Sequence, residues 1–281
     1  MDSAGMDARS NGLNGAAILG FGHLGRPLAE ALYQQGRAVA ALKRRLTSDD
    51  VCLPIALAVA DLNAPEVWTQ PFWAEHWAGK ATWFCLLPPS AVADYADVIG
   101  RWLALAERFQ VAHIVYGSSI SVYGGAVRDC DEDTPPQPDT ESARKVLAAE
   151  QLMWASAVPN VSLLRLGGLY AAERHPLYSL LRRQPARAPH APANMLHRDR
   201  AVAALLAATE DTPGRVVRNV VETPQPSRLD FYRREAAKLG VAAPEFDMGD
   251  HSGGKKVYSL WDETLECVLT KRCGGIFGQN P

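Results

Sequence analysis

Cysteine is scarce in this sequence and forms no recognisable framework. The 281 residues include five cysteines, an odd number, and no two of them form a Cys-x-x-Cys pair. We therefore expect neither a disulfide scaffold nor a structural zinc site. No other group of His, Asp and Glu has metal-ligand spacing, so no metal is expected. A chain of this length can bury a full hydrophobic core without such cross-links.

Long apolar runs and an excess of charge of one sign are also absent. The longest stretch without Asp, Glu, Lys or Arg runs from Phe109 to Val127, and it contains three serines and three glycines. Such a polar stretch is no membrane span. The net charge of −2, from 29 basic and 31 acidic residues, gives no overall attraction to nucleic acid or to an anionic membrane. We expect neither as a partner.

The beginning of the chain lacks the apolar core of a secretory signal peptide. We expect residues 1–14 to form a flexible leader and the protein to be cytoplasmic. Hydrophobic residues make up 47% of the chain and charged residues 21%, as in an ordinary soluble enzyme.

Short apolar runs alternate with amphipathic stretches over the first 167 residues. The pattern predicts strands at 16–19, 38–42, 56–60, 81–87, 113–116 and 161–166, and helices at 26–35, 91–109 and 142–156. Strands that alternate with helices are typical of a parallel sheet covered on both faces. We therefore predict an α/β fold, a doubly wound parallel sheet of the Rossmann type, over residues 15–167.

The regular alternation ends after Gly167. Residues 168–281 contain a proline-rich segment, predicted helices at 199–208 and 228–239, and a predicted strand at 216–221. We place a smaller substrate-binding lobe here, with some elements returning to the core.

A glycine-rich turn follows the first predicted strand. Gly20-Phe21-Gly22-His23-Leu24-Gly25 matches Gly-x-Gly-x-x-Gly and opens the first predicted helix. In a dinucleotide site the first glycine allows the tight turn, the second lets the diphosphate approach, and the third lets helix and strand pack closely. The helix N-terminus offers free N–H groups to the anion. These six residues are candidate cofactor ligands; the alternative is a plain glycine turn.

The second predicted strand ends in three cations. Lys43, Arg44 and Arg45 stand where an NAD site usually carries an acid for the ribose 2′-hydroxyl. Cations suit a 2′-phosphate instead, so the sequence predicts NADP(H) over NAD(H); the alternative is a solvated basic turn. Asp61 is either an adenine contact or a strand-end cap, and Leu87 is a further candidate cofactor contact.

Three more segments, together with the glycine turn, resemble the extended and atypical short-chain dehydrogenase/reductases, which include the NAD-dependent epimerase/dehydratases. Residues 116–124, YGSSISVYG, are similar to the family's SSxxVYG. Residues 164–170, LRLGGLY, are similar to its RxxGxYG, and residues 194–199, NMLHRD, to its NxIHxxD. The resemblance runs from about residue 16 to about residue 239 and implies a nicotinamide-dependent enzyme.

The resemblance implies that Ser119, four residues before Tyr123, binds the reacting substrate oxygen. A hydroxyl at the carboxyl end of a strand faces the crevice where open α/β sheets bind ligands. Ser118 and Ser121 are weaker candidates, and Tyr123 is expected to pack near the site. The alternative is that these serines only cap and turn the loop.

The family's catalytic Tyr-x-x-x-Lys is degenerate here. Aligning residues 147–151, LAAEQ, with the family's common ending puts Ser142 at the tyrosine position and Val146 at the lysine position. Sliding by one residue keeps Lys145 but puts Glu141 in place of the tyrosine. A serine hydroxyl is a far weaker acid than a phenol, and Glu141 could donate a proton only if burial raised its pKa. The candidate substitute donors are Ser119, Glu141, Tyr170 and Tyr178.

Arginine is concentrated between residues 165 and 200. Seven arginines stand there against two acids, Glu173 and Asp199. This local charge suggests a small anionic substrate, such as a nucleotide sugar, phosphate ester or carboxylate, with Tyr170 and Arg174 as candidate contacts. The alternative is a solvated arginine face. The patch lacks interleaved aromatics, which argues against nucleic acid.

Three tryptophans, Trp68, Trp73 and Trp77, are spaced five and four residues apart. We expect an apolar helix face packed on the sheet edge; the alternative is an oligomer contact in a homodimer.

Together these features predict an NADP(H)-dependent oxidoreductase or epimerase/dehydratase-like enzyme with a non-standard proton donor. Its substrate would be a small anionic or sugar-like carbonyl or hydroxyl compound. The lost tyrosine motivates the alternative, an NADP(H)-binding sensor or partner protein without redox turnover.

Overall fold

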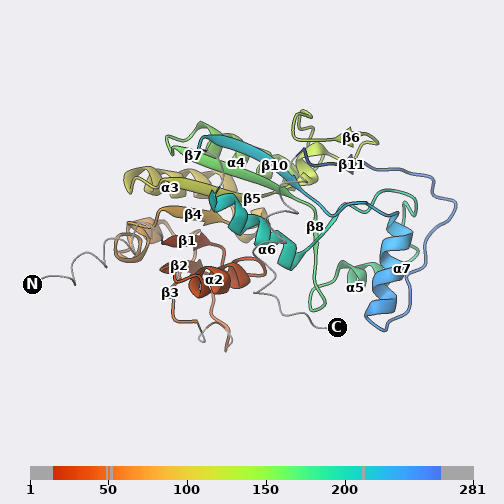
Figure 1. Ribbon diagram of the computed structural model, residues 1–281, viewed down its shortest axis with the longest axis horizontal. Helices are drawn as coiled ribbons and strands as arrows, with labels where there is room; N and C mark the ends of the chain where they lie inside the picture. The colour runs from red at the N-terminus through yellow and green to blue at the C-terminus, as the bar shows by residue number, and fades with distance from the viewer. Residues whose placement is uncertain (1–14, 49, 51–52, 211–212, 261–281) are drawn as a thin grey trace, which may run out of the picture.

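A parallel sheet forms the centre of the protein (Figure 1). The computed structural model describes residues 15–48, 50, 53–210 and 213–260. The main sheet has seven strands in the order β10-β7-β5-β4-β1-β2-β3, and every pairing is parallel. Its strands are β1 (Ala16–Leu19), β2 (Val39–Lys43), β3 (Ala56–Val59), β4 (Thr82–Cys85), β5 (His113–Ser119), β7 (Asn160–Leu166) and β10 (Arg215–Val220). The predicted doubly wound sheet is confirmed.

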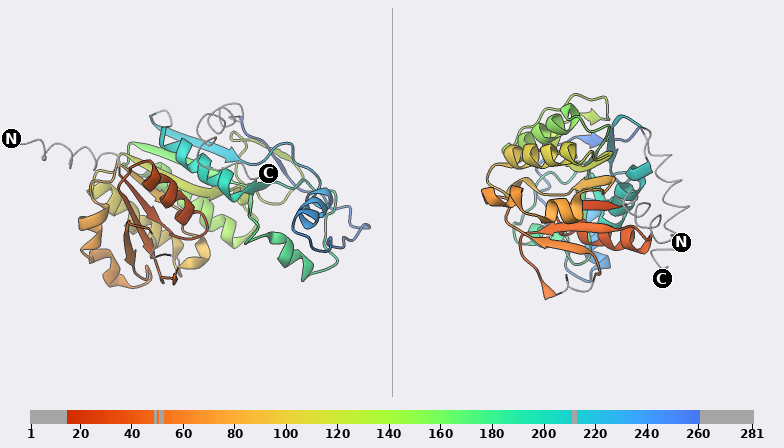
Figure 2. Two further views of the ribbon diagram at one scale, coloured as in Figure 1. Left: turned by 60° about the horizontal axis from the view of Figure 1, so that its bottom comes forward. Right: turned by 90° about the vertical axis from the view of Figure 1, so that its left-hand side faces the viewer.

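Helices cover both faces of the sheet, as Figures 1 and 2 show. These are α2 (Gly25–Gln34), α3 (Tyr95–Arg108), α4 (Glu141–Ala155) and α6 (Arg198–Ala207), whereas α5 (Pro176–Leu181) and α7 (Arg228–Lys238) lie away from the sheet. Helices α3 and α4 pack side by side on one face, and α2 and α6 on the other. Two hydrophobic cores result, and alternate residues of each central strand enter opposite cores.

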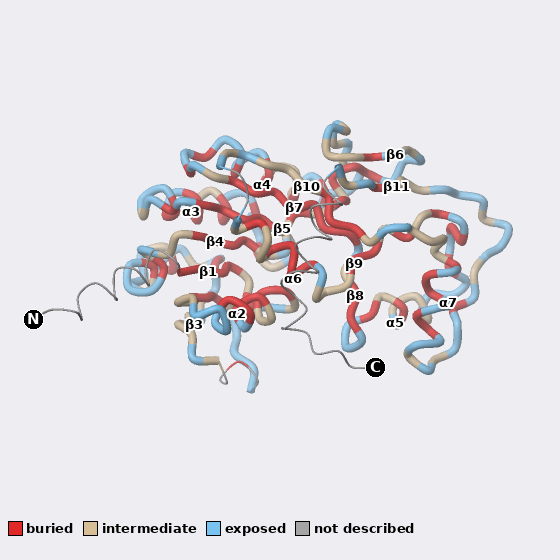
Figure 3. Tube along the Cα trace, in the orientation of Figure 1, coloured by how far each residue is buried: buried red, intermediate tan, exposed pale blue. Residues whose placement is uncertain are grey.

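A smaller lobe lies beyond the carboxyl ends of the strands. It holds the pair β8 (Gly168–Tyr170) and β9 (Met195–His197) together with α5 and α7. Its own small core includes Leu177, Phe231 and Ala236. The chain then returns along the molecule, where β11 (Lys256–Val257) pairs with β6 (Asp129–Cys130). Figure 3 shows the buried chain in the sheet and the exposed outer loops of the lobe.

The tryptophans pack inside the protein. Trp73 and Trp77 lie in a π-helical turn (Trp73–Trp77), not in the long amphipathic helix that the spacing suggested. Both are almost fully buried and form a ring cluster with Trp83 of β4. Trp68 is partly buried and stacks on Trp73. Because Trp73 and Trp77 are enclosed, neither can supply the oligomer contact considered above.

Two of the five cysteines, Cys85 and Cys130, are free and buried; Cys52, Cys267 and Cys273 fall outside the described residues, as does the predicted leader. Burial raises the pKa of the Cys85 thiol to about 12, so this thiol stays protonated. None of the helices in the described part of the chain has the length and hydropathy needed to cross a bilayer.

A buried histidine makes the stability of the fold depend on pH. His113 opens β5, and its Nε2 lies 2.8 Å from Ser162 Oγ. Burial lowers the pKa of His113 to about 4. An unfolded histidine titrates near 6.5, so between pH 6.5 and pH 4 the unfolded state binds more protons and stability falls as the pH falls.

We expect protonation of unfolded His113 to cost about 2 kcal/mol of folding free energy at pH 5 relative to pH 7. Urea unfolding of the wild type and of His113→Gln at both pH values measures this. Other groups titrate equally in both proteins, so the loss on acidification should be about 2 kcal/mol smaller in the variant. Equal losses would show that His113 is not the sensitive group.

Candidate functional site

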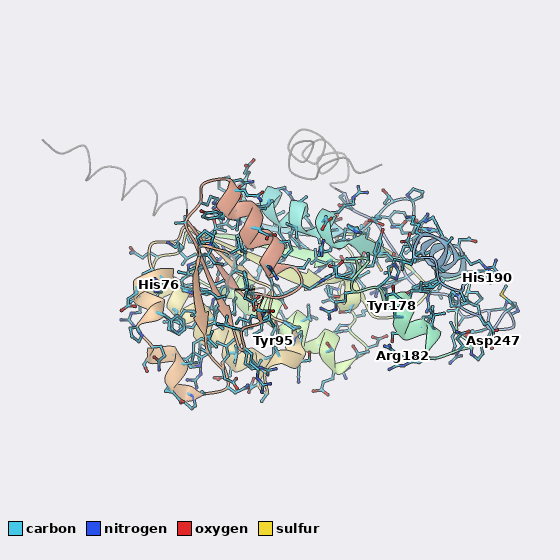
Figure 4. The ribbon with its side chains drawn as sticks, turned by 90° about the horizontal axis from the view of Figure 1, so that it is seen from below. His76, Tyr95, Tyr178, Arg182, His190 and Asp247 are labelled. Atoms are coloured by element: carbon cyan, nitrogen blue, oxygen red, sulfur yellow. The ribbon has the colours of Figure 1, made fainter. Side chains whose placement is uncertain are left out.

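A cleft of about 740 Å³ opens at the carboxyl ends of β1 to β4, the edge where open α/β sheets bind ligands. The glycine turn and the ends of β2, β3 and β4 form its core-side wall. The segment from Leu169 to Arg182, which includes α5, forms the opposite wall. Figure 4 shows Tyr178 on α5 and Arg182 directly after this helix, where the lobe approaches the core.

The glycine turn has the geometry of a dinucleotide site. Gly20 has a φ of +101°, and a Cβ there would lie 2.8 Å from the backbone of Leu86. A Cβ on Gly25 would lie 2.2 Å from Gly20 O, because α2 packs closely on β1. Gly22 differs from both: apart from its two chain neighbours, no atom of the described residues lies within 4 Å of the place a Cβ would take, so its backbone faces open space. All six turn residues except Gly25 line the cleft.

The start of α2 is open to an anion. No side chain caps it at Leu24. Arg26 N already donates to Gly22 O and Pro27 has no N–H, so among the first residues of the helix it is the backbone N–H of Gly25 that is left for a ligand. His23 Nε2 is buried and has no hydrogen-bond partner among the described residues. Burial lowers the pKa of His23, and the nearby guanidinium groups of Arg174 and Arg198 lower it further.

The three cations after β2 have different surroundings. Lys43 Nζ lies 2.5 Å from Asp50 Oδ2, and the same carboxylate accepts hydrogen bonds from Thr47. Although burial opposes it, these bonds lower the pKa of Asp50 to about 2, so Lys43 is neutralised by a charged partner. Arg44 lines the cleft and donates to Ala91 O at 3.3 Å. Arg45 is exposed and lies outside the cleft lining, so of the three predicted contacts Arg44 is the one that lines the cleft without a carboxylate partner among the described residues.

Asp61 and Leu87 line the cleft near these cations. Asp61 Oδ1 accepts hydrogen bonds from the backbone and side chain of Asn63, which lower the pKa of Asp61. It therefore caps the end of β3 while still facing the cleft. Leu87 O accepts a hydrogen bond from Tyr95 Oη at 2.8 Å, which holds the chain after β4.

The serines of the expected substrate site lie on β5 itself, which is three residues longer than predicted. Ser118 and Ser119 therefore face opposite sides of the sheet. Ser118 points at α4 and donates to Glu150 Oε1 at 2.5 Å, away from the cleft. Ser119 Oγ accepts from Ser121 N at 3.1 Å and caps the short 3-10 turn Ile120–Tyr123. Neither Ser119 nor Ser121 lines the cleft.

A buried polar network stands behind these serines. Glu150 of α4 forms a bidentate ion pair with Arg165 of β7, at 3.0 Å and 2.8 Å. Arg165 also donates to Tyr123 Oη at 2.9 Å, and this oxygen lies 2.9 Å from Asn219 Oδ1 of β10. Tyr123 is completely buried and does not line the cleft. Sequence reasoning missed this network, although an arginine inside the apolar strand LLRL could have signalled it.

The candidate residues at the start of α4 do not have the properties expected of a proton donor. Glu141 and Ser142 are exposed, and Lys145 Nζ lies 3.0 Å from Glu141 Oε1. The hydrogen bond and charge of Lys145 lower the pKa of Glu141, the reverse of what a proton donor needs. Exposure explains the difference, because the effect of burial on this carboxylate is outweighed by the lysine. None of the three lines the cleft.

Of the two lobe residues expected at the site, Arg174 lines the main cleft and Tyr170 does not. Tyr170 Oη donates to Glu222 Oε2 at 2.9 Å and lines a separate pocket of about 410 Å³ with Arg200 and Arg234. Burial and Glu222 raise the pKa of Tyr170. Arg174 lines the main cleft. Of the four candidate donors, Tyr178 is the one that lines this cleft. The described residues contain no cluster that could hold a metal ion.

Comparison with known proteins agrees with this architecture. No family model matches the chain. YeeZ from Escherichia coli K12 is 29% identical over 262 residues, which is 86% of this chain and 89% of YeeZ.

Solved structures match over most of the chain. MoeE5 in complex with UDP-glucose and NAD superposes with a TM-score of 0.70 at 23% identity, covering 90% of this chain and 92% of MoeE5. UDP-glucuronic acid 4-epimerase from Bacillus cereus, in complex with UDP-glucuronic acid and NAD, gives 0.70 at 15% identity, covering 91% and 93%. UDP-glucose 4-epimerase from Thermotoga maritima gives 0.71 at 13% identity, covering 90% and 92%. The chain therefore has the fold of these epimerases, as its motifs implied.

Proposed function

We propose that the cleft binds NADP(H) and that the protein is an oxidoreductase or epimerase/dehydratase-like enzyme acting on a small anionic or sugar-like substrate. One observation carries the proposal. Gly22, with open space beside its backbone, and Arg44 line the same cleft. A diphosphate would sit at Gly22 and a 2′-phosphate at the guanidinium of Arg44. The solved neighbours that bind NAD with a sugar nucleotide support this class of chemistry.

The residues present fit such a cofactor. The glycine turn and the uncapped start of α2 would hold its diphosphate, and His23 Nε2 is a buried polar atom without a protein partner. The apolar side chains of Phe21, Leu62 and Leu87 line the cleft and would exclude water. When bound, the nicotinamide supplies hydride transfer, and the protein supplies binding and orientation.

Cofactor preference in this proposal depends on Arg44. We expect NADPH to bind more tightly than NADH, because a charge-assisted contact to the 2′-phosphate exists only in NADPH. Arg44→Ala should weaken NADPH by about ten- to a hundredfold, as expected for a hydrogen bond to a charged group, and should leave NADH unchanged. Calorimetric titration of both dinucleotides measures this.

Arg45→Ala is the matched control, because Arg45 is the neighbouring arginine and lies outside the cleft lining. It should change neither affinity. If NADH binds as tightly as NADPH and Arg44→Ala alters neither, the NADP(H) assignment is wrong.

Turnover separates an enzyme from a dinucleotide-binding sensor. Absorbance at 340 nm with nucleotide sugars and small carbonyl compounds should reveal substrate-dependent oxidation of NADPH or reduction of NADP⁺. A protein that binds NADPH but never turns it over across such a screen would support the sensor alternative instead.

A further inference from the structure

The lobe side of the cleft carries unpaired positive charge. Arg174 and Arg182 both line the cleft. Within the described residues, neither guanidinium has a carboxylate partner. The neighbouring Arg198 differs, because it is paired with Glu173 and Asp199. Unpaired arginines that line a concave surface raise the local concentration of an anionic ligand.

The charge inside the cleft is unbalanced. Among the described residues, Asp61 is the single carboxylate that lines it, against the three arginines Arg44, Arg174 and Arg182. Lys43 does not add to the excess, because Asp50 neutralises it. Arg44 lies at the end of β2, and the other two arginines come from the lobe. The cleft therefore presents cations on both of its walls.

Arg174 is the lobe arginine whose charge acts on the glycine turn. Its charge acts on His23, the fourth residue of the turn, and helps to lower the pKa of that histidine. Burial is the largest cause of that shift, and Glu173 and Asp199 act on the same histidine in the opposite direction. Because Arg174 also lines the cleft, its positive charge would add to the backbone N–H groups of the turn and the dipole of α2 in attracting an anion.

We infer that Arg174 binds the diphosphate of the dinucleotide from the lobe, on the wall of the cleft opposite the glycine turn. This inference rests on the proposed cofactor. The cofactor would then be held between the two parts of the chain, with Gly22 on one side and the guanidinium on the other. Arginine suits this role because its planar group forms two parallel hydrogen bonds with phosphate oxygens.

The test compares Arg174→Ala with Arg183→Ala in calorimetric titrations. Arg183 is an exposed arginine nine residues further on that does not line the cleft, so its replacement is the matched control. Arg174→Ala should weaken NADPH and NADH by the same factor, about ten- to a hundredfold, because both carry the diphosphate. Affinity for 2′-AMP, which has no diphosphate, should not change. Arg183→Ala should bind all three ligands like the wild type.

Three outcomes separate the possibilities. If the wild type binds NADPH and Arg174→Ala binds it equally well, the inference fails and the proposed function stands. If the wild type binds neither dinucleotide, the proposed function fails. A sugar nucleotide also carries a diphosphate, so UDP-glucose is titrated alongside. Weaker UDP-glucose binding by Arg174→Ala with unchanged NADPH binding would assign the arginine to the substrate and overturn the inference.

Discussion

Replacing Gly22 with alanine is expected to remove most dinucleotide binding without loosening the fold. In the described part of the chain, no atom other than those of the two adjoining residues lies within 4 Å of the new methyl group, and Gly22 is not in a left-handed conformation. Stability should therefore stay within about 0.5 kcal/mol of the wild type. The methyl group would occupy the space through which a diphosphate reaches the backbone. We expect a loss of affinity of the order of a hundredfold, about 2.7 kcal/mol, in a titration with NADPH.

Gly25→Ala is the control that distinguishes a steric clash with the ligand from a steric clash within the protein. Its methyl group would lie 2.2 Å from Gly20 O, so α2 and the turn would have to move apart. Overpacking of this kind typically costs about 1–3 kcal/mol, which urea unfolding would detect. Gly22→Ala should show no such loss. Wild-type NADPH affinity in Gly22→Ala would mean that the diphosphate binds elsewhere.

The largest loss of stability is expected from breaking the buried pair of Arg165 and Glu150. Both side chains are less than a tenth exposed, and the carboxylate keeps the arginine charged, raising its pKa despite burial. Arg165→Met would leave the charge of Glu150 buried with Ser118 as its remaining side-chain donor. Removing one partner of such a pair costs about 3–5 kcal/mol of unfolding free energy.

The double variant Arg165→Met/Glu150→Leu should lose less stability than either single variant, because no uncompensated charge remains. Urea unfolding of the four proteins in this cycle gives the coupling directly. Arg101→Ala is the matched surface control: its ion pair with Asp97 is half exposed and should contribute less than about 1 kcal/mol. Additive losses in the cycle would contradict a coupled buried pair.

Sequence periodicity was sufficient for the core but not for the direction of individual side chains. The strand at 113–116 was visible as an apolar run, whereas its continuation through Gly117, Ser118 and Ser119 contains no large apolar residue to mark it. Because side chains alternate along a strand, this extension decides which serine faces α4. No local pattern shows that Ser118 meets a carboxylate 32 residues away.

The residues that form the lobe-side wall of the cleft could not be predicted from local sequence pattern either. The glycine turn has a spacing that fixes its geometry, so its place at the end of β1 could be predicted. Arg174, Tyr178 and Arg182 lie in a short helix and its flanking loop, where proline interrupts the periodicity. Their charge pointed to an anion, but only the tertiary fold shows that they face the glycine turn. Likewise, Asp50 comes after a stretch without secondary-structure signal, and its pairing with Lys43 depends on how that loop folds back.

The way the chain runs between core and lobe bears on how a ligand enters. It passes to the lobe at Gly167, returns at His197, leaves again after Val220 and comes back through the pairing of β11 with β6. Asn194 adds hydrogen bonds to Lys255 O and Val257 N. A hinge works when few connections absorb the bend, and here rotation about one connection would strain the others. We therefore expect the lobe to form a fixed wall of the cleft, on which the exposed arginines and Tyr178 can change rotamer on the picosecond to nanosecond scale.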